Sequence, residues 1–128
     1  MKYAMLIYLD ENSLSEQQRE KCYQESALYA QQLSSGGKCL AAMPLHPTAT
    51  ATSVRIRGDK PIVTDGPFAE TREQLGGFFL VEAKDLDEAI EIASHIPAGR
   101  WGTVEIRPVV EIAGLPTSEG PLTSGAAN

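Results

Sequence analysis

The sequence predicts an α+β domain of the ferredoxin-like type, a split βαβ arrangement with an antiparallel sheet and an inserted β-hairpin. Strand-like and helix-like segments follow one another in the order strand, helix, strand, hairpin, strand, helix, strand. Two capping patterns, Ser15 with Gln18 and Asp85 with Glu88, open the two helices. The Gly58-Asp59 pair between two apolar runs marks the hairpin turn. Right-handed crossovers would place both helices on one face of such a sheet.

The first strand, expected at residues 2–9, is apolar at both alternating sets of positions. Both of its faces must therefore be covered in the folded protein. The first helix runs to a stop at Gly36-Gly37. Its inner side is predicted to consist of Cys22, Leu28, Tyr29 and Leu33. A short second strand then covers residues 38–42, and the proline-containing residues 43–47 break it.

The hairpin strands are expected at residues 54–57 and 61–64, so the returning strand delivers Asp65 to a turn at Gly66-Pro67. The next segment, Ala69 to Leu75, contains good helix formers and predicts one or two helical turns. Gly76-Gly77 then releases the chain into a buried strand at residues 78–82.

The second helix ends before Pro97, and His95 in its last turn complements the helix dipole. Its inner side is predicted to consist of Ala89, Ile90, Ala93 and Ile96. The last strand is expected at residues 103–112, where Pro108 indicates an edge position or a bulge. Small and polar residues dominate afterwards, so we expect a domain at residues 1–112 and a flexible tail at residues 113–128.

Length and composition restrict the function classes. The 128 residues, 42% of them hydrophobic and 22% charged, suffice for one soluble domain. A net charge of -6 without clustered Lys or Arg argues against nucleic-acid binding. The apolar N-terminal run stops at Asp10 and is too short to span a membrane, so a cytoplasmic location is expected. Cys22 and Cys39 lack metal or redox spacing, and no nucleotide, metal or serine-hydrolase motif supports a cofactor.

The apolar strands also predict an oligomeric state. If both helices cover one face of the sheet, the other face remains apolar and uncovered. We therefore expect a second copy to cover it, sheet on sheet, in a symmetric homodimer.

Turn formers, charges and aromatics are densest at residues 65–78, which read Asp-Gly-Pro-Phe-Ala-Glu-Thr-Arg-Glu-Gln-Leu-Gly-Gly-Phe. Together with Glu-Ile-Arg-Pro at residues 105–108, this stretch resembles the signature of DGPF-domain proteins in the YCII-related superfamily, whose motif reads Asp-Gly-Pro-Phe-Ala-Glu-Thr-Lys-Glu. The resemblance implies a dimeric α/β barrel. Arg72 stands where the family usually has Lys, which excludes a role that requires a deprotonated Lys.

The preferred catalytic pair is Asp65 with His46. His46 lies in a loop bracketed by prolines just before the hairpin that delivers Asp65. A carboxylate beside an imidazole orients it and makes it a general acid or base near neutral pH, and the resemblance implies such a pair in some superfamily members. The alternatives stay open at this point, because Asp before Gly is a common turn former and a loop histidine can simply be solvated.

The expected substrate-binding residues come from the motif and from the last strand, and they are Phe68, Glu70, Arg72, Glu105 and Arg107. Glu105 and Arg107 are two positions apart on a strand and therefore point the same way. If that face lines a cavity, an arginine fork there binds a carboxylate or carbonyl oxygen. If it faces solvent, the two residues form an ordinary surface ion pair.

Two functions compete on this evidence. The first is a small cofactor-independent enzyme that uses the Asp65 and His46 pair on a small carbonyl or carboxylate metabolite, with the homodimer forming the pocket. The second is a non-catalytic ligand-binding or regulatory module, since the resemblance implies an association of some relatives with sigma factors of the extracytoplasmic-function type. The acidic charge argues that such regulation would act through a ligand or a protein partner.

Overall fold

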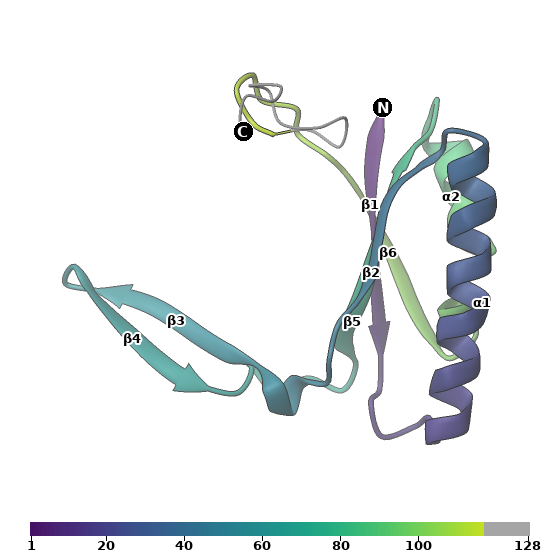
Figure 1. Cartoon of the computed structure of the whole chain (residues 1–128). Helices are drawn as coiled ribbons and strands as arrows, with labels where there is room; N and C mark the ends of the chain where they lie inside the picture. Colours follow the sequence, from purple (N-terminus) through teal and green to yellow (C-terminus); the bar gives the residue numbers. More distant parts are fainter. Residues whose placement is uncertain (117–128) are drawn as a thin grey trace.

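The computed structural model describes residues 1–116 and contains a four-stranded antiparallel sheet in the order β2-β5-β1-β6 (Figure 1). The strands span the ranges β1 (Lys2–Leu9), β2 (Cys39–Pro44), β5 (Gln74–Glu82) and β6 (Gly102–Pro108). The helices α1 (Glu16–Ser35) and α2 (Leu86–Ser94) lie together on one face of the sheet. This is the predicted ferredoxin-like α+β architecture, with the hairpin inserted between β2 and β5.

Both helices begin at the residues that the capping patterns predict. The Gln18 amide donates to Ser15 Oγ over 3.1 Å, and the Ser15 amide donates to Gln18 Oε1 over 2.8 Å, which closes a reciprocal capping box. The Glu88 amide donates to the carboxylate of Asp85 over 2.9 Å at the start of α2. The sequence itself therefore fixes where each helix starts.

The predicted inner faces of the helices are correct except at two positions. Leu28 is 60% exposed and Ile90 is 50% exposed, so neither contributes to the core. On α2 the buried isoleucine is Ile92 instead, three positions after Ala89 on the same helix face. The core between helices and sheet consists of side chains from β1, β5, α1 and α2, chiefly Tyr3, Met5, Ile7, Cys22, Phe79, Val81, Ala89 and Ile92.

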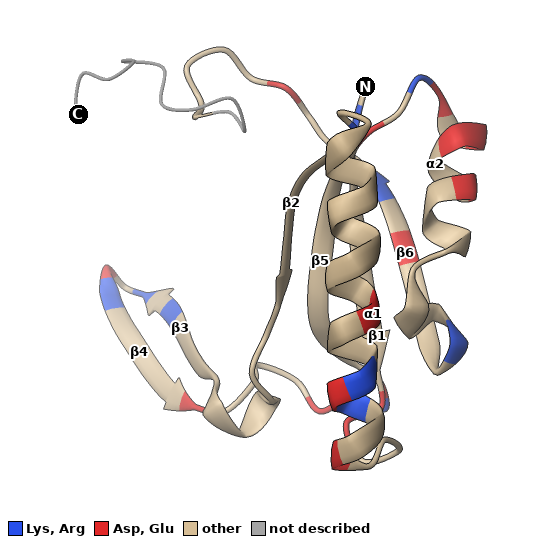
Figure 2. Ribbon diagram, turned by 45° about the vertical axis from the view of Figure 1, so that its right-hand side comes forward, with Lys and Arg blue, Asp and Glu red and all other residues tan. Residues whose placement is uncertain are grey.

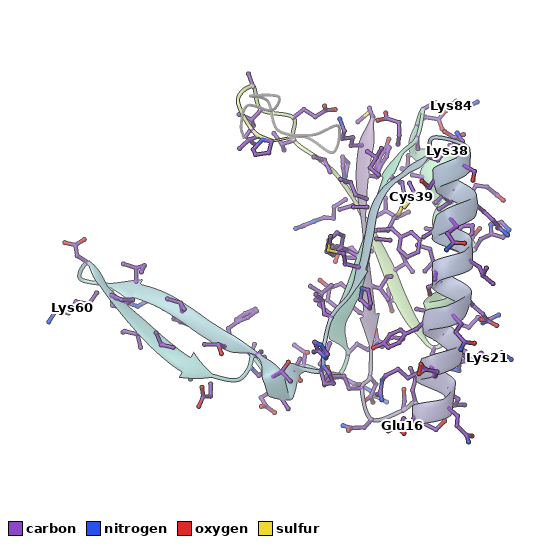
Figure 3. The ribbon with its side chains drawn as sticks, viewed as in Figure 1. Glu16, Lys21, Lys38, Cys39, Lys60 and Lys84 are labelled. Atoms are coloured by element: carbon purple, nitrogen blue, oxygen red, sulfur yellow. The ribbon has the colours of Figure 1, made fainter. Side chains whose placement is uncertain are left out.

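The inserted hairpin forms a separate two-stranded sheet of β3 (Thr52–Arg57) and β4 (Lys60–Asp65), which we call the hairpin arm. Its turn residues Gly58 and Asp59 have positive φ angles of 57° and 66°, as the twist of a two-residue hairpin turn requires. The arm extends away from the sheet on the side opposite the helices, and its side chains, including Lys60 at the tip, stand free (Figures 1 and 3).

The prediction of one or two helical turns at Ala69 to Leu75 is wrong. This stretch contains no helix, and β5 already begins at Gln74. The side-chain amide of Gln74 donates to the carbonyl oxygens of Thr71 and Arg72, at 2.6 and 3.3 Å, and these bonds stabilise an irregular loop. A helix of only one or two turns is not stable by itself, so these hydrogen bonds favour the loop.

The glycine pair lies within β5 and does not precede it. A Cβ on Gly77 would lie 2.8 Å from the carbonyl oxygen of Met43, so glycine permits the close approach of β2 and β5. As a result β2 continues through Met43 and Pro44, beyond the predicted break.

The last strand is shorter than predicted, because β6 ends at Pro108, which lacks a backbone donor. Its position at the edge of the sheet agrees with the expectation from this proline. Residues 117–128 of the expected flexible tail lie outside the described residues.

Acidic residues gather at the start of α2, where the positive end of the helix dipole favours them (Figure 2). The carboxylate of Glu88 contacts the Lys38 ammonium at 2.8 Å and accepts the backbone N–H of Lys84 at 2.8 Å. These two hydrogen bonds, Lys38 foremost, lower the pKa of Glu88 from its ordinary value.

The lowered pKa predicts a pH-dependent contribution to stability. Ionised Glu88 is favoured in the folded chain, so its contribution is complete above the ordinary pKa of about 4.5 and is lost as the pH falls through the lowered folded value. We expect Glu88→Gln to lower the melting temperature by a few degrees at pH 7 and by less as the pH falls toward 3. Asp87→Asn, in the same first turn, serves as control. An equal deficit at both pH values would contradict the assignment.

The glycine pair predicts a difference between neighbouring alanine substitutions. Gly77→Ala drives its Cβ into the backbone of β2, so we expect a loss of about 1 to 3 kcal/mol in the free energy of unfolding by urea. Gly76→Ala meets no atom closer than 3.8 Å and is expected to change stability little. Similar losses in both variants would show that close strand approach is not the reason for glycine.

Candidate functional site

Asp65 and His46 lie near the base of the hairpin arm. Asp65 is the last residue of β4, and Gly66, at a positive φ of 98°, turns the chain directly after it. The Gly66 amide donates to the Ala51 carbonyl over 2.7 Å, which holds this turn against the start of β3. His46 lies in the loop between β2 and a 3-10 turn at Thr48–Thr50. Both side chains are exposed, and within residues 1–116 no hydrogen bond or ion pair joins them.

A polar network that the sequence analysis missed ties this region together. Both carboxylate oxygens of Glu11 accept hydrogen bonds from Thr48, one from its amide and one from its hydroxyl, each at 2.8 Å. The Glu11 amide donates to Gln74 Oε1 over 2.9 Å. The network links the end of β1, the loop that carries His46 and the start of β5. Because its three members lie far apart in sequence, no spacing pattern could have revealed it.

The motif residues after Asp65 form an exposed loop that connects the arm to β5. Phe68 is 80% exposed, and Glu70 and Arg72 are exposed as well. At the end of the loop the Glu73 side chain contacts β6, where Thr103 Oγ1 donates to Glu73 Oε1 over 3.0 Å. The DGPF motif is therefore anchored at both ends, while Phe68, Glu70 and Arg72 between them are exposed.

The other predicted residues lie on the face of the sheet opposite the helices, which we call the open face. Alternation along β1 buries one set of side chains under the helices and leaves the other set on the open face. Two cross-strand rows run over this face, one of Met43, Phe78, Leu6 and Glu105 and the other of Ala41, Leu80, Ala4 and Arg107. Each row is apolar until it reaches a charged residue on β6.

Arg107 and Glu105 form a weak contact, with Arg107 Nε 3.7 Å from Glu105 Oε2. Both side chains are exposed, so the pair contributes only about 0 to 1 kcal/mol to stability. Their charges remain available for a ligand or a partner. The single chain thus brings the predicted residues together in two groups, the arm base with the motif loop and the β6 side of the open face.

Within the described residues, no group of three His, Cys, Asp or Glu side chains is placed to hold a metal ion. The same residues include no helix long and apolar enough to cross a membrane. The chemistry that this region offers is that of an imidazole, carboxylates and guanidinium groups.

These features define a ferredoxin-like α+β protein with an inserted hairpin arm that carries Asp65 at its base. The profile of the YCII-related domain matches residues 1–113, almost the whole of the described chain. An uncharacterized protein of Rhizobium meliloti strain 1021 is 35% identical over 114 residues, covering 85% of this chain and 92% of that protein. The chain belongs to the YCII-related family, as the motif predicted.

A solved structure shares the fold. The 5-chloro-2-hydroxyhydroquinone dehydrochlorinase TftG of Burkholderia phenoliruptrix AC1100, in complex with 2,5-dihydroxybenzoquinone, superposes with a TM-score of 0.55. The match covers 86% of this chain and 94% of that chain at 21% sequence identity. At this identity the likeness establishes the α+β fold.

The Glu11 network generates a prediction about the arm base. Glu11→Gln replaces one acceptor oxygen by an N–H₂ group that opposes the donors of Thr48, so we expect about 1 kcal/mol of local destabilisation and roughly fivefold faster hydrogen exchange at the Thr48 amide. Glu16→Gln, exposed at the start of α1, is the matched control. Unchanged exchange at Thr48 would mean that the network does not hold the loop.

Proposed function

We propose that this protein is a homodimer whose two open faces pack together. The observation that supports this most directly is that an apolar sheet face and the hairpin arm lie on the same side of the molecule (Figure 1). The arm itself exposes apolar side chains, with Val54, Ile56 and Val63 about 60% exposed. A lone soluble chain rarely leaves so much apolar surface uncovered, whereas a second copy would cover both the face and the arm.

We further propose that the dimer is a small cofactor-independent enzyme. The second copy would enclose the arm base, where His46 and Asp65 supply a general base and acid and the exposed ring of Phe68 packs on the substrate. Arg72 and Arg107 would bind a carbonyl or carboxylate oxygen, and Glu70 and Glu105 would orient them. Enclosure matters for this chemistry, because the same charges act more strongly once water is excluded.

The substrate class we propose is a small ring compound that carries carbonyl, hydroxyl or carboxylate groups. TftG, which shares the fold, is described as acting on a chlorinated hydroxyhydroquinone and as binding a dihydroxybenzoquinone. Proton transfer on such a compound requires an acid, a base and an oxygen-binding cation, and these are the groups that the motif and β6 provide.

The dimer is tested by sedimentation equilibrium at micromolar concentration. The wild type is expected at twice the chain mass of 13.8 kDa. Leu6→Glu places a carboxylate beside Glu105 in the middle of the open face, so we expect at least a tenfold weaker association. Leu86→Glu alters an exposed leucine on the helix side and should leave the dimer intact. A monomeric wild type, or equal behaviour of both variants, would refute this arrangement.

The catalytic pair is tested by a turnover screen with hydroxyquinones, hydroquinones, lactones and aromatic acids. For a compound that is turned over, we expect His46→Gln or Asp65→Asn to reduce kcat by about 10² to 10⁴. His95→Gln is the matched control, because that imidazole contacts the carbonyl of Glu91 at the end of α2. Full activity in His46→Gln would remove His46 from the mechanism. Binding without turnover would favour the non-catalytic module, including one that acts on a sigma-factor partner.

A further inference from the structure

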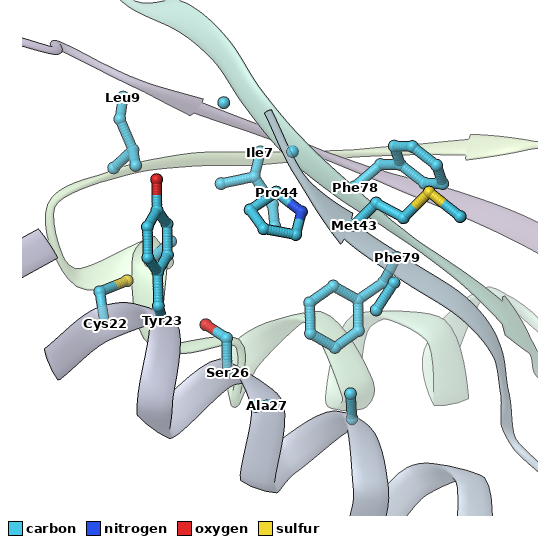
Figure 4. Close-up of a pocket in the computed structure, with 15 residues that line it drawn as sticks. Ile7, Leu9, Cys22, Tyr23, Ser26, Ala27, Met43, Pro44, Phe78 and Phe79 are labelled. Carbon is cyan, nitrogen blue, oxygen red and sulfur yellow. The ribbon is translucent and has the colours of Figure 1, made fainter. Parts of the chain in front are cut away.

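A cavity of about 340 Å³ lies between α1 and the β2 and β5 strands, on the helix side of the sheet (Figure 4). Its walls are mainly apolar and include the aromatic rings of Tyr23 and Phe79. The Ser26 hydroxyl points from α1 into this space. A volume above 300 Å³ with apolar walls and a few polar groups is typical of small-molecule sites. None of the residues of the proposed acid and base cluster lines it.

The cavity exists because both of its walls lack bulk. Cys22, Ser26 and Ala30 follow one another at intervals of four on α1, so they share the helix face that meets the sheet. Gly76 and Gly77 form the facing part of β5. A helix packed on a sheet normally fills this layer with branched or aromatic side chains. Here the missing side chains leave room for a ligand.

The cavity adjoins a smaller hollow whose lining includes the positively charged side chain of Arg19. The two hollows share the lining residues Leu9, Cys22, Tyr23 and Gly76. Arg19 lines the second hollow and is held in place because its Nη2 donates to the Glu11 carbonyl over 3.0 Å. Among residues 1–116 no ion pair includes this guanidinium. Glu11 also lines the second hollow, but both of its carboxylate oxygens accept hydrogen bonds from Thr48. Arg19 therefore has donors left for a ligand.

The Cys22 thiol can serve as a chemical probe of ligand binding in these two hollows, because it lines both. The residue is only 5% exposed and lines both hollows, with Ser26 close by. Burial raises the pKa of the Cys22 thiol, although Ser26 acts in the opposite direction, so the thiol is protonated near neutral pH. Cys39, the second cysteine of the chain, lines neither hollow.

We infer that this cavity is a second ligand site, which binds a one-ring or two-ring aromatic carboxylate with its ring between α1 and β5 and its acid group at Arg19. The aromatic walls select a flat apolar body, and the guanidinium forms a fork that matches two carboxylate oxygens. The site lies on the opposite side of the sheet from the open face. It therefore goes beyond the function proposed above and does not depend on the dimer.

Thiol protection tests the inference, with 2-naphthoate as the probe. In a Cys39→Ser background, Cys22 is the only thiol, and its modification by methyl methanethiosulfonate is followed by mass spectrometry. We expect saturating 2-naphthoate to slow this reaction at least tenfold. In the matched Cys22→Ser background the reaction of Cys39 should change less than twofold. Unslowed modification of Cys22, or equal protection of both thiols, would overturn the proposal.

The role of Arg19 is tested by comparing an acid with its neutral amide. Arg19→Gln should weaken protection by 2-naphthoate at least tenfold while changing protection by 2-naphthamide less than threefold. A merely structural role of Arg19 would weaken both probes equally and would contradict the assignment.

A cavity-filling variant provides an independent check. Ser26→Leu puts a larger side chain into the cavity and improves helix propensity, so we expect a folded protein that has lost 2-naphthoate binding by isothermal titration. Gln24→Leu, on the exposed side of α1, should bind as the wild type does. Equal affinities of the two variants, both shown to be folded by their melting curves, would place the ligand elsewhere.

Discussion

Burial of the two central strands is the constraint on which the rest of this structure depends. β1 and β5 carry apolar side chains on both of their faces, yet α1 and α2 cover only one face. The covered face forms the core around Met5 and Val81, both fully buried. The other face presents apolar rows that end at Glu105 and Arg107. A second copy is the simplest way to remove this surface from water, and the proposed site follows from it.

A second theme is the use of small residues where elements approach each other. Gly77 lets β2 approach β5 closely and so sets where the chain leaves the sheet toward the hairpin arm. Gly76 and Gly77 also face the small residues Ser26 and Ala30 of α1, and the lack of bulk on both sides leaves the cavity beside Arg19 open. One feature of the sequence therefore shapes both the arm base and the proposed second ligand site. The two sites lie on opposite sides of one sheet and can be tested separately.

Much of the fold could be predicted because its signals are local. The helix caps at Ser15 and Asp85, the hairpin turn and the alternation along β1 depend on residues within a few positions of one another. The errors arose where a distant contact decides the outcome. Ala69 to Leu75 forms a loop because the Gln74 side chain donates hydrogen bonds to the carbonyl oxygens of Thr71 and Arg72. The break expected at Met43 is absent because Gly77 allows β2 to approach β5 closely.

The candidate site was less predictable for the same reason. The motif located Asp65 and its loop, and the spacing of Glu105 and Arg107 correctly put them on one face. The Glu11 network and the Arg19 cavity join segments that are far apart in the chain, so no pattern indicated them. The proposed joint action of His46 and Asp65 requires enclosure by a second copy, and contacts between chains leave no local pattern in a single sequence.

The central claim, that a second copy covers the open face, is tested most directly by isotope-filtered NOE spectroscopy on a mixture of labelled and unlabelled protein. The account predicts contacts between chains that involve the methyl groups of Leu6 and Leu80, both on the open face. Contacts between chains that involve only the exposed helix residues Leu28 and Ile90, or no such contacts at all, would contradict it.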